Sequence, residues 1–562
     1  MMLFRELAEY YERLEAVSSR LKMVEMLSEA FRALDPKELE ETVYITQGIM
    51  LPPFEGVELG VAEKLVEEGI AIATGYKKEE VEREYKKSGD MGLAVQTIKE
   101  KTRLRRMDSK KYSVSETYGR VRKIAETGGE GSKDRKIGMI ADMIGSATPT
   151  EAKYTVRYLL GQLRLGVGDS TIMEALSVIG TGNREFKGEI ERAYNICSDL
   201  GLVARELAGG GPKAIEGFKV TLFKPVRPAL AERLPTAEQI LERMHGTAAV
   251  EQKYDGFRVQ VHKDGNTVKL FSRRLEDTTE MFPDIAKAVR EEVGVRRIIF
   301  EGEALAFNES TSEYLPFQET IQRKRKHGIA KKIEELPLHL FAFDVLYLDD
   351  RDMLGEPYEK RRATIESMFR NGRMITPTTK IITSSPKELE AFFEKSVENG
   401  LEGIMAKDLK APYIAGARKF SWIKLKRSYK GELSDTLDLV IVGYFLGRGG
   451  RAEFKFGGLL CAAYNKKRDM FETISVDSVV EPDFWVQPKY VVTINADEIT
   501  RSPMHTCGRA KNEEGIETGY ALRFPRLVGP SAIRDDKGPE DATTTEEVIE
   551  MFKQQKKVGV KG

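Results

Sequence analysis

Apolar residues recur every three or four positions in the first part of the chain, which predicts amphipathic helices. The clearest stripe lies within residues 1–34 and consists of Leu3, Leu7, Leu14, Val17, Leu21, Val24, Leu27 and Phe31. Further on, Thr148 can cap a helix, Pro149 suits its first turn, and Glu151 completes a capping box. Helical spacing continues to about Leu207, where the run Gly209-Gly210-Gly211-Pro212 interrupts it. We therefore predict an all-α domain over residues 1–211.

After residue 211 the pattern changes to short runs typical of strands. The segment from Val259 to Phe271 predicts two strands around the hairpin turn Lys263-Asp264-Gly265-Asn266. Further strands are predicted at 297–300 and 338–348, and helices at 284–293 and 387–399. This mixture predicts an α+β domain over residues 212–430. The β-rich segments 439–442 and 490–494, followed by a terminal helix at 546–557, predict a small β-barrel domain over residues 431–562.

Length and charge constrain the class of protein. The chain has 562 residues, more than one hydrophobic core usually holds, so several domains are expected. Lys plus Arg and Asp plus Glu both number 89, so the net charge is zero. A protein that only clamps nucleic acid would be basic overall. Neutrality still permits DNA binding, because charge can be segregated onto one face.

The cysteines and the hydrophobic runs indicate a cytoplasmic protein. Cys197, Cys461 and Cys507 are far apart and form no C-x-x-C pair, which argues against a zinc site and a disulfide framework. The opening residues, MMLFRELAEYYERLE, are too charged for a signal peptide. No apolar run reaches the roughly 18 residues that a membrane span needs. We expect no contact with a membrane.

A lysine at a strand–turn junction is the first candidate for chemistry. It lies in Lys253-Tyr254-Asp255-Gly256-Phe257-Arg258, where Asp255 and Gly256 would form the turn that presents the amine. A lysine acts as a nucleophile when desolvation and nearby cations favour its neutral form. Alone, K-x-D-G is a weak pattern, and a solvated lysine beside a hairpin is the more common explanation.

Seven further groups follow this lysine in a fixed order. They are Ser272-Arg273-Arg274, Glu301-Gly302-Glu303-Ala304, Phe341-Ala342-Phe343-Asp344, Glu402-Gly403-Ile404-Met405-Ala406-Lys407, Tyr413 to Lys426 (which includes Arg418 and Trp422), and the basic groups Arg523-Phe524-Pro525-Arg526 and Arg534-Asp535-Asp536-Lys537. The series resembles the covalent nucleotidyltransferase superfamily, and within it the ATP-dependent DNA ligases of archaea and eukaryotes. The segment Leu163-Arg164-Leu165-Gly166-Val167-Gly168 is similar to the amino-terminal DNA-binding domain of these ligases. The resemblance covers nearly the whole chain and implies that the barrel is an OB-fold.

The resemblance implies how each group would act on ATP. Lys253 would attack the α-phosphorus and become lysyl-AMP, the AMP would pass to the 5′-phosphate at a nick, and the 3′-hydroxyl would then displace it. Glu251 would read the adenine amino group, because a guanine would leave the carboxylate without a donor. Phe343 would stack on the adenine. The remaining nucleotide contacts would come from Arg258, Arg273, Glu303, Arg418, Lys424 and Lys426.

Metal and DNA contacts follow from the same resemblance. Glu303 and Glu402 would hold Mg²⁺, directly or through water. DNA contacts are expected from Arg164, Arg448 and Arg451, and pyrophosphate contacts from Arg534 and Lys537. The link from Arg526 to Arg534 is longer than in the family pattern, which leaves Arg523 and Arg526 as alternatives. A hinge is predicted at residues 431–438.

Nicked duplex DNA is the expected partner of a monomeric protein, and a sliding clamp is left open as a second partner. The stretch 96–112 occupies the place of a clamp motif in some relatives but lacks paired aromatics. Taken singly, Phe343 would fit a core aromatic, Glu303 and Glu402 solvated carboxylates, and the basic residues 418–430 an exposed face. An RNA ligase or capping guanylyltransferase is disfavoured by the helical first domain and Glu251. A non-catalytic DNA-binding scaffold is disfavoured by the complete lysine motif, and an NAD-dependent ligase by the lack of a four-cysteine zinc module.

Overall fold

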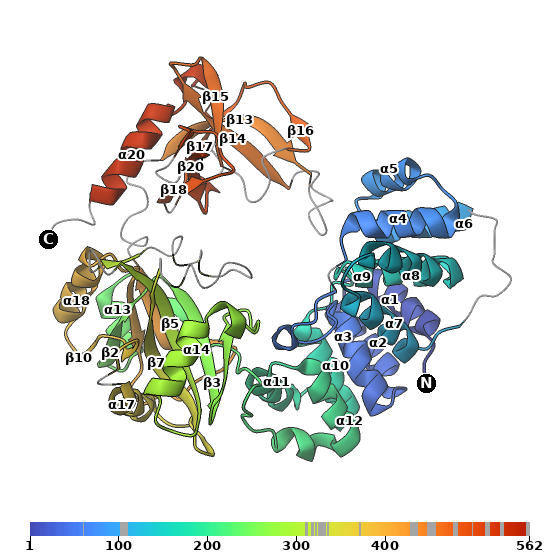
Figure 1. Cartoon of the computed structure of the whole chain (residues 1–562), viewed down its shortest axis with the longest axis horizontal. Helices are drawn as coiled ribbons and strands as arrows, with labels where there is room; N and C mark the ends of the chain where they lie inside the picture. Colours follow the sequence, from blue (N-terminus) through green and yellow to red (C-terminus); the bar gives the residue numbers. More distant parts are fainter. Residues whose placement is uncertain are drawn as a thin grey trace. The chain divides into compact units, whose positions relative to one another are not determined.

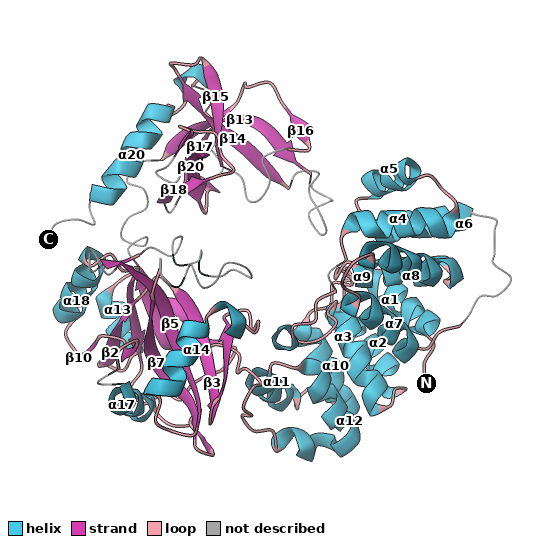
Figure 2. Ribbon diagram, in the orientation of Figure 1, coloured by secondary structure: helices cyan, strands magenta, loops and turns pink. Residues whose placement is uncertain are grey.

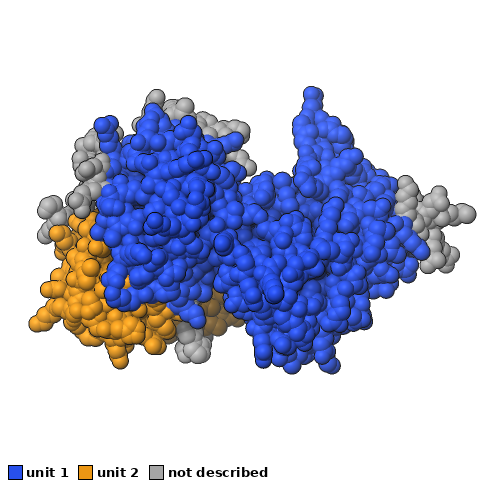
Figure 3. Space-filling view, turned by 90° about the horizontal axis from the view of Figure 1, so that it is seen from below, with its two compact units in different colours: residues 1–230, 256–378, 410–419 blue, residues 231–255, 379–409, 420–562 orange. Residues whose placement is uncertain are grey.

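The structure of the protein is a computed structural model. This structure describes the whole chain apart from residues 60, 102–110, 309–312, 316–319, 321–322, 324–332, 334–335, 370–371, 427–435, 447–456, 476–481, 497, 512–516, 529–532, 535 and 558–562. The chain forms two compact units, shown in different colours in Figure 3. Unit 1 contains residues 1–230, 256–378 and 410–419, and unit 2 contains residues 231–255, 379–409 and 420–562.

The amino-terminal part of unit 1 is built from helices (Figures 1 and 2). They are α1 (Phe4–Glu15), α2 (Arg20–Arg32), α3 (Pro36–Gln47), the 3₁₀ turn η1 (Pro53–Glu55), α4 (Glu63–Thr74), α5 (Lys78–Ser88), α6 (Met91–Lys101), α7 (Val114–Glu126), α8 (Ser132–Ser146), α9 (Pro149–Leu159), α10 (Asp169–Thr181), α11 (Lys187–Cys197) and α12 (Leu200–Glu216). Their apolar faces share one core, to which α1 contributes Phe4, Leu7 and Tyr11. The predicted all-helical character of this region is confirmed.

The capping box of α9 and the apolar stripe over residues 1–34 were both predicted from the sequence. Thr148 caps α9 by accepting a hydrogen bond from the Glu151 amide, and the Glu151 carboxylate accepts one from the Thr148 amide, so the predicted capping box is present. The single stripe predicted over residues 1–34 is wrong at Leu21, whose side chain is 56% exposed. The chain leaves helical geometry between α1 and α2, which shifts the phase of the stripe at that point.

The glycine run after Leu207 lies inside α12. Gly211 has φ 67° and ψ −166°, so the helix breaks there, and Pro212 starts a second helical segment that reaches Glu216. Only a residue without Cβ adopts that pair of angles readily, which explains the glycine. The helical pattern therefore continues a little past the position where the sequence suggested that it ends.

Unit 1 also holds a mostly antiparallel sheet in the strand order β4-β3-β5-β7-β8, with β6 paired to β5 and β9 to β7. Its strands are β3 (Phe257–Asp264), β4 (Thr267–Ser272), β5 (Arg297–Asn308), β6 (Glu313–Tyr314), β7 (Leu338–Leu348), β8 (Arg351–Asp352) and β9 (Ile375–Pro377). The helices α14 (Pro283–Glu292) and α17 (Tyr358–Phe369) share an apolar core with this sheet, and η2 (Thr279–Met281) precedes α14. The predicted hairpin is confirmed, because β3 and β4 pair with Asp264 opposite Thr267.

A second sheet, in unit 2, has the strand order β1-β12-β11-β2-β10. Its strands are β1 (Leu230–Arg233), β2 (Ala248–Lys253), β10 (Lys380–Thr383), β11 (Gly403–Lys407) and β12 (Arg418–Lys426). One face packs against α13 (Ala237–Arg243) and α18 (Pro386–Glu398) through a core that includes Val250, Ile404 and Ile423. Both sheets mix strands with the helices predicted near 284–293 and 387–399, so the α+β prediction is confirmed.

The carboxyl-terminal part of unit 2 contains two further antiparallel sheets. One has the order β15-β14-β13-β17-β21, with β16 paired to β13, and the other has the order β18-β20-β19. The elements are β13 (Leu437–Phe445), β14 (Gly458–Asn465), β15 (Met470–Ser475), β16 (Phe484–Trp485), β17 (Val491–Asn495), β18 (Glu498–Ser502), β19 (Ala510–Lys511), β20 (Glu517–Arg523), β21 (Arg526–Leu527), η5 (Pro539–Asp541) and α20 (Thr545–Lys557). The predicted strands and terminal helix are present, whereas a closed barrel is not shown by this strand pairing.

Candidate active site

The second sheet separates an apolar face from a charged face by simple alternation. Along β2, Ala248 and Val250 point into the core beneath α13 and α18, so Glu251 and Lys253 lie at positions of the opposite face or its edge. In β11 and β12 the same alternation places Lys407 and Lys426 away from that core. The sheet therefore gathers the charged residues of three strands on one side.

Lys253 lies beside Glu402 and Lys426 on this charged face. The Glu402 carboxylate accepts hydrogen bonds from both amines, one through each oxygen. The strand register explains the cluster, since Gly403 of β11 pairs with Lys253 on one side and with Lys426 on the other. A Cβ on Gly403 would lie 2.2 Å from the Leu425 carbonyl oxygen, so only glycine fits between the two lysines.

The charge state of Glu402 follows from these neighbours. Burial would raise the pKa of its carboxyl group, but Lys253 and Lys426 outweigh that effect and lower the pKa below its ordinary value. Glu402 is therefore an anion held between two cations. The arrangement keeps two amines close together, as a site for a polyphosphate requires.

A second charged pair lies in the same sheet and joins Glu251, a predicted site residue, to Lys407, which was not predicted. The Lys407 ammonium is 2.9 Å from the Glu251 carboxylate, and both side chains are buried. The same ammonium lies 4.2 Å from the centroid of the Trp422 ring, a cation–π distance. The sequence signal for Lys407 was a charged residue at the end of an otherwise apolar strand, which is unusual unless a buried anion faces it.

In unit 1, Arg258 is held by a buried carboxylate. Its Nε and Nη2 atoms donate to the two oxygens of Glu301 at 3.3 and 2.8 Å, and Nη1 donates to the Ala229 carbonyl at 3.1 Å. The Tyr413 hydroxyl donates to Glu301 at 2.8 Å. Burial would lower the pKa of Arg258, but Glu301 raises it above its ordinary value. Glu301 and Tyr413 were quoted in the motifs but not predicted as site residues.

Phe343 lies next to this arginine. The Arg258 guanidinium carbon is 5.3 Å from the centroid of the Phe343 ring. Phe343 is buried, yet the neighbouring core contains Ala342 and Val345 and does not include Phe343. The ring thus lies on the same face of the sheet as Arg258 of β3, away from the apolar core.

The remaining predicted nucleotide residues are less closely grouped in the structure. Glu303 pairs with Arg258 in the β3–β5 register and is half-buried. Arg273 directly follows β4 and is exposed. Lys424 pairs with Met405 in the β11–β12 register. Arg418 begins β12, and its side chain lies outside the described residues.

The carboxyl-terminal basic residues share one carboxylate. Asp438 accepts hydrogen bonds from Arg534 at 2.9 Å and from Lys537 at 2.7 Å, and also from the Thr493 hydroxyl at 2.6 Å. Burial would raise the pKa of Asp438, but Lys537, Thr493 and Arg534 lower it. Of the predicted hinge, residues 431–435 lie outside the described residues, and Asp438 is already part of β13.

The predicted DNA contacts are only partly described. Arg164 lies in the loop between α9 and α10, whereas Arg448 and Arg451 lie outside the described residues. Within the described residues, no group of three or more His, Cys, Asp or Glu side chains could hold a metal ion. None of the helices described in the structure is long and apolar enough to cross a membrane. The three cysteines are buried thiols.

Two family models match most of the chain. The model described as the ATP dependent DNA ligase domain matches residues 228–426, the region of both mixed sheets. The model described as the DNA ligase N terminus matches residues 3–177, within the helical part. The chain therefore belongs to the family of ATP-dependent DNA ligases and is an enzyme.

Individual relatives agree with this assignment. The chain is 47% identical to the probable DNA ligase of Dictyoglomus thermophilum over 585 residues, which cover 99% of this chain and 98% of that protein. It is 41% identical to the DNA ligase of Pyrobaculum islandicum over 590 residues, 99% of each chain. Among solved structures, one titled Pmar-Lig_PreS3 has the same fold, with a TM-score of 0.56 and 18% identity over 93% of this chain and 98% of that chain.

Proposed function

We propose that this ligase seals nicks in duplex DNA through an AMP group carried on Lys253. The observation that supports the assignment is the cluster in which Glu402 holds Lys253 and Lys426 side by side. Phosphate oxygens of ATP would take over Glu402's role as the anion between the two amines. Substitution of one anion by another changes the local charge little and brings the α-phosphorus to the nucleophile.

The chemistry then runs in three transfers. As ATP replaces Glu402 beside it, the Lys253 ammonium first loses a proton to solvent. The lone pair of the neutral amine then forms an N–P bond to the α-phosphorus, the bond to the β-phosphate oxygen breaks, pyrophosphate leaves with that electron pair, and the nitrogen loses a second proton to solvent. A 5′-phosphate oxygen at the nick next attacks the same phosphorus and returns the electron pair to the lysine nitrogen. Finally the 3′-hydroxyl attacks the 5′-phosphorus, loses its proton, and expels AMP.

Adenine recognition is assigned to the second charged pair. The Glu251 carboxylate would accept a hydrogen bond from the adenine amino group, and the contact with Lys407 holds that carboxylate in place. Phe343 would supply a stacking surface, and Arg258 a rigid guanidinium for the ribose or phosphates. Arg273, Glu303, Arg418 and Lys424 would complete the nucleotide contacts according to the family pattern.

Magnesium fits the donor chemistry of the acidic residues. Mg²⁺ prefers hard oxygen ligands and often takes only one or two carboxylates together with substrate phosphates. Glu402, and Glu303 by the family pattern, offer such carboxylates, and Glu402 is ionised beside the lysine that reacts. The bound metal would offset negative charge on the phosphates during transfer.

The carboxyl-terminal sheets are proposed to form an OB-fold that faces DNA. Small barrels of this class bind nucleic acid on one face. Arg448, Arg451 and Arg164 would contact DNA phosphates, and Arg534 with Lys537 would contact the departing pyrophosphate. Nick sealing of this kind serves DNA replication, repair and recombination, which we propose as the pathways of this ligase.

Mass spectrometry of the purified chain tests the central step. After incubation with ATP and Mg²⁺, the chain should gain one adenylate group, and GTP should give far less product. Lys253→Ala should abolish the adduct but still seal in part a nick that already carries AMP, since that step needs no nucleophilic lysine. Lys387→Ala, at an exposed position of α18 on the apolar side of the same sheet, is the matched control and should label normally. Normal labelling of Lys253→Ala would refute the proposal.

A further inference from the structure

The loop between α9 and α10 has an unusual backbone at Arg164. This residue has φ 57°, a left-handed conformation that side chains other than glycine rarely adopt. Its neighbours Leu163 and Leu165 are buried in the helical core, so the loop is fixed on both sides of it. Such a conformation persists only where the surroundings determine it fully, and it is enriched at ligand contacts.

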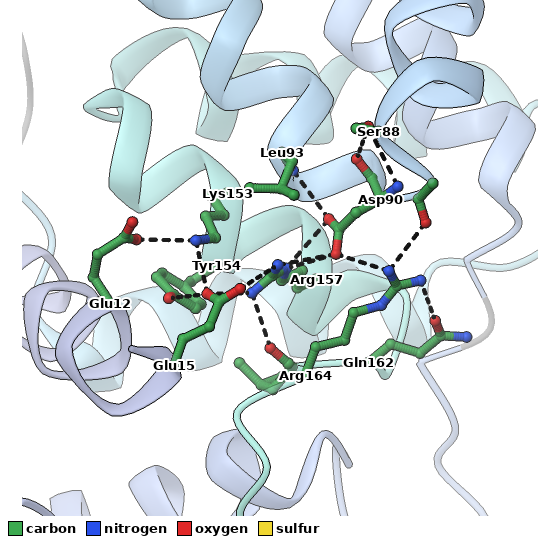
Figure 4. A network of polar contacts seen from close by, with 12 residues as sticks. Glu12, Glu15, Ser88, Asp90, Leu93, Lys153, Tyr154, Arg157, Gln162 and Arg164 are labelled. Atoms are coloured by element: carbon green, nitrogen blue, oxygen red, sulfur yellow. Dashed lines mark hydrogen bonds and ion pairs between the residues drawn. The ribbon is translucent and has the colours of Figure 1, made fainter. Parts of the chain in front are cut away.

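The Arg164 guanidinium is anchored along one edge. Its Nη1 atom donates to the Gly89 carbonyl at 3.0 Å and lies 3.0 Å from an oxygen of Asp90. Asp90 is 4% exposed, whereas Arg164 is 27% exposed, so the arginine sits at the rim of the protein with the carboxylate behind it. At the other edge, Nη2 has a long contact of 3.4 Å to Gln162 Oε1. Figure 4 shows the arginine between Gln162 and Asp90.

Asp90 is itself fixed by other contacts. It caps α6, because its carboxylate accepts a hydrogen bond from the Leu93 amide at 3.0 Å. It also faces the buried Arg157, whose Nη2 lies 2.9 Å from the same carboxylate. One buried anion therefore serves two guanidinium groups, and Arg157 approaches it from the interior.

Arg157 connects Asp90 to the loop and to α1. Its Nη1 donates to the Leu163 carbonyl at 3.3 Å, directly before Arg164, and to Glu15 at 2.9 Å. Lys153 also contacts Glu15, at 2.7 Å, and the contacts among these groups are drawn in Figure 4. Gly92 leaves room for the network, since a Cβ there would lie 2.8 Å from Arg157 Cγ.

We propose that Asp90 is a positioning residue for DNA binding, which holds the Arg164 guanidinium so that its outer edge meets a backbone phosphate. The inference rests on the proposed function, because it takes nicked DNA as the ligand. A guanidinium offers two edges, and an edge of two N–H groups matches a phosphate. Nη1 is occupied by Gly89 and Asp90, so a phosphate would be met by Nε and by Nη2, whose contact to Gln162 is long at 3.4 Å. Anchoring reduces the rotamer freedom that a long side chain would otherwise lose on binding.

The affinity of the full chain for nicked duplex DNA, measured over a series of salt concentrations, tests this role. Arg164→Ala should reduce the affinity on the order of tenfold, the effect of one charge-assisted hydrogen bond. It should also lower the slope of log affinity against log salt by about one, as expected for one lost phosphate contact. Arg5→Ala removes the same charge from an exposed pair on α1 and is the control, with a small effect on both quantities.

Two variants distinguish positioning from a general effect on folding. Arg164→Lys keeps the charge but lacks the planar edge of two N–H groups that matches a phosphate, so it should weaken binding while retaining most of the salt slope. Asp90→Asn should weaken binding as well, and adding it to Arg164→Ala should cause little further loss, because both act through one contact. A merely structural role for Asp90 would give additive losses.

The outcomes can be separated from failure of the proposed function. If the unmodified chain forms no AMP adduct and does not bind nicked DNA, the proposed function itself fails. If it does both, wild-type affinity in Arg164→Lys would overturn the inference. Tighter binding in Asp90→Asn would also overturn it, since the carboxylate would then act only as a repulsive charge. The lysine variant leaves the buried Asp90 in place, so it remains informative if Asp90→Asn fails to fold.

Discussion

The buried ion pair between Glu251 and Lys407 should make the sheet around Lys253 sensitive to one substitution. The two side chains are 3% and 1% exposed, and their charged atoms are 2.9 Å apart. Lys407→Met removes the ammonium but keeps an unbranched side chain of similar length, so Glu251 is left as a buried anion. Loss of one partner from a buried pair costs about 3–5 kcal/mol. At about 1.4 kcal/mol per tenfold, the local unfolding equilibrium shifts by roughly two to four powers of ten.

Hydrogen exchange read by mass spectrometry suits this measurement better than a global melting curve, because a chain with several domains does not unfold in one step. Amides of β2 and β11 should lose protection in Lys407→Met, while those of the helical part in unit 1 should not. Lys410→Met is the matched control. Lys410 pairs with Glu359 at the surface and is 77% exposed, so its loss should cost less than about 1 kcal/mol.

The double variant Glu251→Gln with Lys407→Met separates the ion pair from simple packing. With both charges gone, no buried ion remains, and most of the lost protection should return. If the β2 and β11 amides of Lys407→Met are as protected from exchange as those of the unmodified chain, the ion pair does not stabilise the sheet by the expected amount. A double variant as unprotected as the single one would show that the loss came from packing against Trp422, whose ring lies 4.2 Å from the ammonium.

Two further predictions concern charge elsewhere in the chain. Arg534→Ala with Lys537→Ala should lose AMP labelling by ATP yet still seal a nick that already carries AMP, because the pair is proposed to act on departing pyrophosphate. Charging at the normal rate would exclude that role. In the helical part, burial would raise the pKa of Glu15, but hydrogen bonds from Arg157 and Lys153 outweigh it and lower the pKa to about 2 from 4.5. Because the pKa is lowered in the folded state, Glu15 stabilises the fold above about pH 4.5, and this contribution is lost as the pH falls towards 2. Glu15→Gln should therefore be less stable than the unmodified chain at neutral pH. Denaturant titrations should also show that its stability changes less with pH between 4.5 and 2.

Local chemistry was predicted well because it depends on neighbours in the sequence. The cap at Thr148 needs only a hydroxyl and a glutamate three residues later, and both interactions are present. The β3–β4 hairpin needs only two alternating runs and a turn, with Gly265 at φ 57°. The burial of Leu21 failed because it depended on where α1 ends, and no strong breaker marks that point in the sequence.

Pairings between distant residues could not be predicted in the same way. Lys407 meets Glu251 because β11 and β2 pair in a register that puts Met405 opposite Glu251, and a shift of one residue would move Lys407 to the apolar face. Nothing in the local pattern fixes that register. The order of motifs made Lys253 and Glu402 candidate site residues through the family resemblance, but it could not show that Glu402 contacts two lysines. The same holds for Asp438, which meets Arg534 and Lys537 only through the folded carboxyl-terminal sheets.

The neutral charge of the chain takes on a physical meaning once these pairs are considered together. Several cations proposed to meet the phosphates of ATP already face a carboxylate of the protein: Lys253 and Lys426 face Glu402, Arg258 faces Glu301, and Arg534 and Lys537 face Asp438. A phosphate that enters the site must either displace the protein's carboxylate from the cation or share the cation with it. Binding is then weaker than to cations with no such partner, since part of the Coulomb attraction is already satisfied. If the enzyme works by the proposed transfers, internal carboxylates that pair again with the cations after each transfer would favour the release of pyrophosphate and the passage of AMP to the nick.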